Sequence, residues 1–305
     1  MLTALLQMSL LVACGSIWKS YAPSHIPAIA HRRSLTDLVF YLLLPAMVLD
    51  VTWRTPLTGA SFQVSFLAAL GVVSGFIVTW QALRLFDIKN RQKGALLLAG
   101  AFPNVTYLGL PVLDQVLGPE TRSTVIQYDL FACTPLLLTL GILMARHYGD
   151  GEKIFHPLKD LGKVPPLWAV AIGVCLNLFS IEQPALLHNA LSTMAGGVVP
   201  LMLIVLGMSI RWRSLHIRYI PLLLPVLIST LVIMPAIVLM MSYFLGLSGQ
   251  LQAEVVLIAA MPTMVFGVVI SERYQLDSEL YAAAVTLSTI VSLLTLSLWF
   301  HFLVS

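Results

Sequence analysis

Ten apolar runs, most of them long enough to cross a membrane, follow one another along almost the whole chain. The first is MLTALLQMSLLVACGSIW, and the others cover residues 35–51, 62–83, 94–117, 124–145, 167–179, 187–210, 221–245, 255–270 and 280–304. A run of roughly 20 apolar residues spans the hydrocarbon core as a helix, because no water there can satisfy an open backbone. The 305 residues leave no room for a sizeable soluble domain. We therefore expect an all-α polytopic membrane protein with ten transmembrane helices.

The composition agrees with this class and excludes several functions. Hydrophobic residues make up 58% and charged residues 10% of the chain, whereas a soluble domain is roughly half apolar and a quarter charged. The net charge of +3 comes from basic residues beside helix ends, so we expect no nucleic-acid partner. Cys14, Cys133 and Cys175 lie in apolar runs without a CxxC pair, and no HExxH motif occurs. We expect no disulfide, no metal site and no cofactor.

Two of the apolar runs contain residues that an unbroken helix does not tolerate well. The fourth run includes AFPNVTYLGLP at residues 101–111, with two prolines, a glycine and an asparagine. The ninth run carries Met261-Pro262-Thr263 and then Gly267. Proline removes a backbone donor where water cannot replace it. We expect the fourth and ninth helices to be broken, a pattern that indicates the substrate site of a transporter.

The second half of the chain repeats the plan of the first. Pro45 in the second run is matched by Pro200 in the seventh, 155 residues later, and Pro103 is matched by Pro262, 159 residues later. Five spans per half is an odd number, so the two copies must insert in opposite orientations. The sequence predicts an inverted repeat of two five-helix units, residues 1–147 and 166–305, joined by a cytoplasmic connector at residues 148–165.

The basic residues predict the orientation of the chain in the membrane. Of the 17 Lys and Arg residues, 15 fall in the odd-numbered connections between spans and only Arg54 and Arg122 fall on the other side. Basic loops stay in the cytoplasm. We expect a multi-pass protein of the cell inner (plasma) membrane, with both termini outside the cytoplasm.

Three segments resemble one known family. These are NVTYLGLP at residues 104–111, PLMLIVLGMSI at residues 200–210, and MPTMVFGVVISERYQLD running into TLSTIVSLLTLSLW. They resemble the auxin efflux carrier family, which includes bacterial malonate, malate and oxalate permeases and plant auxin exporters. The resemblance covers essentially the whole chain. It implies a fold shared with the bile acid symporters, in which the fourth and ninth helices cross at their breaks.

The same resemblance implies how such a protein works. Substrate binds at the crossing, and one domain moves against the other in elevator-type alternating access. The second and seventh spans belong to the scaffold with the first and sixth, or pack beside them. The resemblance also makes a homodimer plausible, although ten spans are enough for a complete monomer.

The residues at the two breaks favour a small anionic substrate. Each second half-helix begins with free backbone N–H groups that carry partial positive charge, and a carboxylate fits that position. No Asp or Glu occurs in residues 101–111 or 260–267. The predicted substrate-binding residues are Pro103, Asn104, Thr106, Tyr107, Pro262 and Thr263. In the alternative interpretation, Asn104 only binds backbone groups that Pro103 leaves free.

One acidic residue inside a span is a candidate for proton coupling. Asp129 lies about two turns into the fifth run, with Gln127 and Tyr128 adjacent. A carboxylate inside a membrane is expensive to keep there and is often functional. The alternative is that Asp129 stays near the outer interface and bonds neighbouring helices.

Three functions are compatible with these features. The first and favoured one is a secondary carrier for small mono- or dicarboxylates, coupled to protons or working as a uniporter. The second is a sodium-coupled symporter for a larger organic anion, which is less favoured because sodium usually needs carboxylate ligands. The third is an intramembrane enzyme or sensor, but the sequence has no paired aspartates, no Ser/His dyad and no nucleotide loop. We expect a transporter and not an enzyme.

Overall fold

The computed structural model describes residues 2–21, 26–55, 59–150, 162, 164–210 and 219–304. Within these ranges the chain forms helices and no strand. Six continuous helices are long and apolar enough to cross a membrane: Ala28–Arg54, Gly59–Leu83, Thr121–Tyr148, Ala185–Ser209, Ile220–Phe244 and Ser278–Val304. Shorter apolar helices cover Val105–Leu117, Pro165–Leu178 and Gly249–Ala259. The expected all-α membrane class is confirmed at this level.

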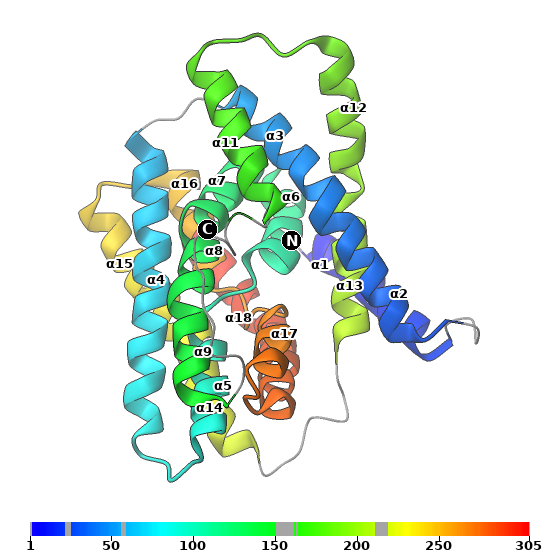
Figure 1. Ribbon diagram of the computed structural model, residues 1–305. Helices are drawn as coiled ribbons and strands as arrows, with labels where there is room; N and C mark the ends of the chain where they lie inside the picture. Colours follow the sequence, from blue (N-terminus) through cyan, green and yellow to red (C-terminus); the bar gives the residue numbers. More distant parts are fainter. Residues whose placement is uncertain are drawn as a thin grey trace. The chain divides into compact units, whose positions relative to one another are not determined.

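The helices follow the predicted apolar runs closely, several of them with a π-helical turn inside (Figure 1). In the first half of the chain they are α1 (Leu2–Tyr21), α2 (Ala28–Leu38), η1 (Val39–Leu43), α3 (Leu44–Arg54), α4 (Gly59–Leu83), α5 (Asn90–Ala101), η2 (Val105–Gly109), α6 (Leu110–Leu117), α7 (Thr121–Tyr128), η3 (Asp129–Cys133), α8 (Thr134–Leu136), η4 (Leu137–Gly141) and α9 (Ile142–Tyr148). In the second half they are α11 (Pro165–Leu178), α12 (Ala185–Gly196), α13 (Val198–Ser209), α14 (Ile220–Ile228), η7 (Ser229–Ile233), α15 (Met234–Phe244), α16 (Gly249–Ala259), α17 (Gly267–Arg273) and α18 (Ser278–Val304).

Most of the π-helical turns are associated with prolines. Proline lacks the N–H of a helical turn, and its ring crowds the carbonyl four residues earlier. A turn widened by one residue relieves this conflict without ending the helix. Four π-helical segments end two residues before a proline, and these prolines are Pro45, Pro111, Pro135 and Pro235. The second proline of the AFPNVTYLGLP segment is therefore compatible with a continuous helix.

Two short segments within the predicted fourth and ninth runs are not helical. Residues 102–104 separate α5 from η2, and residues 260–266 separate α16 from α17. Each segment contains a proline, Pro103 in the first and Pro262 in the second. Phe102 has an extended backbone, which is the conformation that a following proline favours. The helices on both sides of these segments are too short to span a bilayer alone.

The chain divides into two compact units that do not coincide with its two halves. The first unit comprises Met1–Phe62, Thr106–Ile126 and Leu158–Ser209. The second comprises Gln63–Val105, Gln127–Pro157 and Ile210–Ser305. Each unit thus combines helices from both halves of the chain. The repeat boundaries at residues 147 and 166 concern sequence symmetry and stay a prediction.

In the second unit, two helices form the centre. Every residue of α5 from Gly94 to Ala101 is buried, and so is every residue of α16 from Gln252 to Ala259. A helix that is buried all round lies inside a helical assembly. α5 packs against α9, α14 and α18, and α16 packs against α15 and α18 (Figure 1). These two central helices lead directly into the two non-helical segments.

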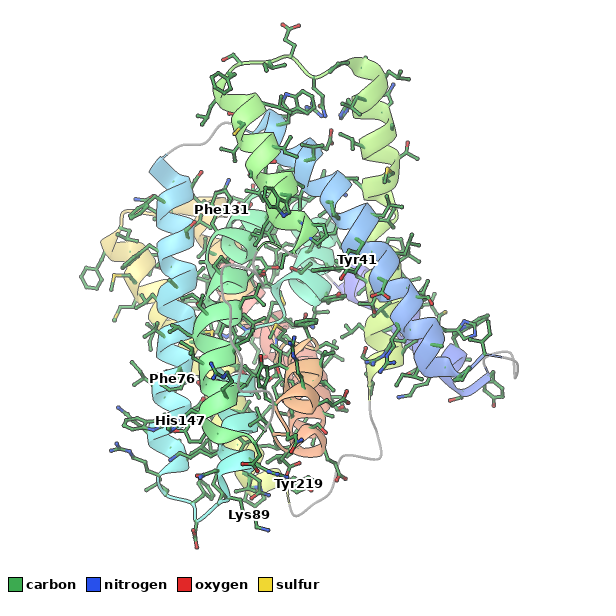
Figure 2. All side chains as sticks on the ribbon, in the orientation of Figure 1. Tyr41, Phe76, Lys89, Phe131, His147 and Tyr219 are labelled. Carbon is green, nitrogen blue, oxygen red and sulfur yellow. The ribbon has the colours of Figure 1, made fainter. Side chains whose placement is uncertain are left out.

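Several basic connections meet at one end of the second unit. The Arg91 guanidinium lies 2.5 Å from the Asp150 carboxylate, and the backbone carbonyl of Arg91 accepts a hydrogen bond from the Asp277 amide. The Lys93 ammonium lies 5.8 Å from the ring centre of Tyr148. Figure 2 shows Lys89, His147 and Tyr219 at this same end. Connections that the charge count assigns to one side of the membrane therefore lie together.

In the first unit, α3 packs against α11 and α12, and α1 packs against α13. The Trp53 indole donates a hydrogen bond to the Ile181 carbonyl, and the Asn177 amide donates to the carbonyl of Trp53, each at 2.7 Å. A methyl group at Gly15 or Gly207 would overlap backbone carbonyls of the opposing helix. Close approach of helix backbones at small residues is a common way to pack membrane helices.

Candidate functional site

The two non-helical segments of the second unit pair with each other through their backbones. Pro103 and Thr263 form an isolated antiparallel bridge. The backbone N–H of Asn104 donates to the Pro262 carbonyl at 2.7 Å, and the backbone N–H of Met264 donates to the Phe102 carbonyl at 3.0 Å. Backbone groups that the prolines remove from helical bonding thus find partners across the pair. This exchange brings four of the predicted site residues together, namely Pro103, Asn104, Pro262 and Thr263.

Thr263 holds this pair to the helices around it. Its backbone amide donates to the Ser288 hydroxyl of α18 at 3.1 Å. Its own hydroxyl donates to the Ala99 carbonyl of α5 at 3.0 Å, and the residue is fully buried. A threonine hydroxyl has one proton to donate, so this donor is already used. The geometry favours a positioning role for Thr263, and direct contact with substrate stays a prediction.

Asn104 differs because its side chain is buried and has no partner. The residue is 1% exposed, and neither its amide nitrogen nor its amide oxygen makes a hydrogen bond within the described part of the chain. The alternative is that the Asn104 side chain bonds the backbone groups that Pro103 leaves free. In the structure these backbone groups bond between the two segments, and the Asn104 side chain takes no part. Leaving a buried amide unpartnered costs about 1–3 kcal/mol. Such a group in a folded protein needs an explanation, and a role in function is one.

Thr106 and Tyr107 follow in η2, within the first unit. Both side chains are partly buried, and both take part in other interactions. The helix formed by η2 and α6 begins at Val105, directly after Asn104. The first amide of this helix, that of Val105, donates to the Pro103 carbonyl at 3.0 Å, so it is bonded outside the helical pattern.

Asp129 begins the π-helical segment η3 inside the span Thr121–Tyr148. Its side chain is partly buried, and the carboxylate accepts a hydrogen bond from the Thr134 hydroxyl at 3.0 Å. This bond is made within its own helix. The proton-coupling role of Asp129 stays a prediction.

Tyr128 directly precedes Asp129, and nothing in the sequence indicates a function for it. Its side chain is 0% exposed, and its hydroxyl has no hydrogen-bond partner in the described residues. A tyrosine in an apolar helix is normally interpreted as packing. Only the tertiary structure reveals that its polar end is buried without a partner.

A second set of polar side chains lies in the first unit. The Asp50 carboxylate accepts a hydrogen bond from Gln183 and lies 2.8 Å from Nδ1 of His188. Nη1 of Arg54 lies 3.2 Å from Nε2 of the same histidine. These contacts join α3 to the start of α12. No group of three or more His, Cys, Asp or Glu side chains within the described ranges is arranged to hold a metal ion.

The fold and the comparisons with known proteins together identify the class. Helices that are long and apolar enough to span a bilayer define a multi-pass membrane protein. Residues 1–300 match the model of a family described as Membrane transport protein. The chain belongs to this family, which is the auxin efflux carrier family that its motifs resemble.

Similar proteins are found in archaea and bacteria. An uncharacterized transporter of Methanothermobacter thermautotrophicus is 30% identical over 273 residues, which cover 87% of each chain. One of Methanocaldococcus jannaschii is 26% identical over 279 residues, covering 88% of this chain and 89% of the relative. A Rhizobium meliloti protein with the name Putative malonate transporter is 24% identical over 284 residues, covering 86% and 84%. The chain is therefore a membrane transporter and not an enzyme.

Proposed function

We propose that this protein is a secondary carrier for small organic anions with one or two carboxylates. The observation that carries the proposal is the side-chain amide of Asn104, which is buried at the paired segments and has no hydrogen-bond partner in the described residues. The amide nitrogen can donate two hydrogen bonds, and a carboxylate is a strong acceptor for them. Binding of such a ligand would give the buried side-chain amide hydrogen-bond partners and remove the penalty of leaving it unpaired.

The surrounding chain also suits an anion. The helix Val105–Leu117 begins immediately after Asn104, and the start of a helix carries partial positive charge that attracts an anion. No acidic residue occurs in residues 101–111 or 260–267 to oppose it. A relative carries the name of a malonate transporter, so malonate belongs among the first ligands to test.

The proposed architecture is an inverted repeat of two five-helix units. In this architecture the fourth and ninth membrane helices are broken and cross each other, and the paired non-helical segments at residues 102–104 and 260–266 support this proposal. The protein lies in the inner (plasma) membrane with both termini outside the cytoplasm, and it functions as a monomer or a homodimer.

Elevator-type alternating access is the proposed transport motion. In this mechanism one compact body carries the substrate site while another stays fixed. The chain contains two compact units, and the paired segments with Asn104 belong to the second of them. Besides Thr106–Ile126, the first unit contains the first, second, sixth and seventh predicted spans. The family resemblance assigns the first and sixth spans to a scaffold, with the second and seventh in it or packed beside it.

A thermal-shift screen of the purified protein in detergent tests the function. The protein is heated with small mono- and dicarboxylates, malonate included, with and without sodium and at several pH values. A ligand at 100 times its Kd stabilises the folded state by about 2.7 kcal/mol, which gives a measurable rise in melting temperature. Stabilisation without sodium supports the carrier. A rise that requires sodium favours the symporter, and no response to any anion contradicts the proposal.

Asn104→Ala should remove this response and reduce carboxylate uptake into proteoliposomes by at least about tenfold, because hydrogen bonds to charged groups contribute about 1.5–3 kcal/mol. The melting temperature without ligand should stay the same or rise, since the lost amide has no partner. Asn177→Ala is the matched control. Its amide donates to the carbonyls of Trp53 and Thr55, so its loss should lower the melting temperature and leave the ligand response intact. Uptake at the wild-type level in Asn104→Ala would exclude this residue from the site.

A further inference from the structure

Tyr128 is a second polar side chain of the second unit that is buried without a partner. Its ring is enclosed in the protein, and its hydroxyl makes no hydrogen bond in the described residues. The surroundings on the opposing helices are apolar or small. A methyl group built on Gly71 of α4 would lie 3.0 Å from this hydroxyl oxygen and 3.4–3.6 Å from Val238 and Met234 of α15. No side chain there takes the place of a hydrogen-bond partner.

The contacts of α4 with α5 fix the level of this hydroxyl. α4 and α5 are consecutive helices that run in opposite directions, because a short connection at residues 84–89 joins them. A methyl group at Gly100 of α5 would overlap Thr79, and one at Gly75 would overlap the Gly100 carbonyl and lie 3.4 Å from Cα of Ala101. Residues nearer the start of α4 therefore lie beside residues nearer the end of α5.

Gly71 lies one helical turn beyond Gly75, which is about 6 Å along the axis. It is thus level with the chain that continues past Ala101, where α5 ends and residues 102–104 begin. The Tyr128 hydroxyl is next to Gly71, and Asn104 is three residues after Ala101. We infer from this geometry that the two buried polar groups lie near the same level of the second unit, where α5 ends.

We propose that the Tyr128 hydroxyl is a second hydrogen-bond donor of the substrate site and binds the same carboxylate-bearing ligand as Asn104. This inference rests on the proposed function and adds a residue to it. Both groups are uncharged, so the site binds the anion through donated hydrogen bonds. A phenol donates one bond and an amide nitrogen two, which suits the oxygens of a carboxylate. Neither group has a hydrogen-bond partner in the described residues, so both are available to a ligand.

Tyr128→Phe tests the proposal because it removes only the hydroxyl oxygen. The measurements are the melting temperature without ligand and the Kd for the carboxylate that gives the largest thermal shift with the wild-type protein. We expect an unchanged or higher melting temperature without ligand, since no hydrogen bond is lost, and a Kd at least about tenfold higher. A packing role for the hydroxyl would instead lower the melting temperature and leave the Kd unchanged.

Thr79→Val is the matched control. Thr79 also has a buried hydroxyl without a partner, but it lies two turns of α4 away from Gly71, on the other side of Gly75. The Kd of this variant should equal that of the wild type.

The outcomes separate this inference from the proposed function. If Asn104→Ala weakens binding and Tyr128→Phe does not, the carrier stands and the role of Tyr128 is overturned. Equal weakening in Tyr128→Phe and Thr79→Val also overturns it, because the effect would then not be specific to this hydroxyl. If the wild-type protein binds no carboxylate, the proposed function fails and the role of Tyr128 fails with it.

Discussion

Asn104 and Thr263 each follow a proline in the paired segments, yet their side chains are used in opposite ways. The Thr263 hydroxyl donates to the Ala99 carbonyl, whereas the side-chain amide of Asn104 has no partner in the described part of the chain. One side of the pair is thus fixed to α5 and α18, and the other side offers free hydrogen-bonding capacity. The difference follows from which backbone carbonyls come within reach, and the sequences Pro103-Asn104 and Pro262-Thr263 do not contain that information.

Asp129 gives a prediction at the same scale. Asp129→Asn keeps the shape of the side chain and removes its ability to exchange a proton. If Asp129 carries the coupling proton, carboxylate uptake by the wild-type protein changes with pH and uptake by the variant does not. Uptake into proteoliposomes at matched substrate concentration, measured across a pH series, checks this. The same pH profile in both proteins would leave Asp129 with a structural role, in keeping with its bond to Thr134.

At the scale of elements, six prolines inside the predicted spans fall into two groups. Four of them follow π-helical turns and leave the helix continuous, while Pro103 and Pro262 lie in non-helical segments. The difference is explained by partners. A one-residue π-bulge leaves most backbone hydrogen bonds of the helix in place. An extended segment has no such bonds of its own and needs a second extended segment as hydrogen-bond partner. The segments that contain Pro103 and Pro262 are such partners for each other.

Gly267 tests how the second of these segments is held. A methyl group here would overlap the hydroxyl of Tyr281, which donates to the Met264 carbonyl at 2.8 Å. Gly267→Ala should therefore displace Tyr281 and lower stability by about 1–3 kcal/mol, even though alanine favours a helix. Thermal unfolding in detergent measures this.

Gly196→Ala is the control for that substitution. Gly196 ends α12, and a methyl group there has nothing within 4 Å. Its melting temperature should equal or exceed that of the wild type. Equal melting temperatures for Gly267→Ala and the wild type would contradict the role assigned to Tyr281.

At the scale of the whole molecule, the topology is open to a direct test. The charge count predicts that both termini lie outside the cytoplasm. Alkaline phosphatase fused after Val304 should be active, because this enzyme folds in an oxidising compartment, and a fusion after Asp150 should be inactive. The end of the second unit where Asp150 pairs with Arg91 would then be the cytoplasmic one. The opposite pattern of activity would reverse the predicted orientation.

The sequence by itself determined the class of the molecule, most helix limits and the family. Helix limits and membrane class follow from the length of the hydrophobic runs and from proline, both of which act locally along the chain. The predicted third run, for example, ends at Leu83, as α4 does. The sequence also pointed to Asn104. Only the tertiary structure decided that Pro111 stays within a helix, that Thr263 is already bonded and that Tyr128 has no partner. The physical reason is that hydrogen-bond satisfaction depends on groups distant in sequence, such as Ala99 and Thr263, which folding brings within reach.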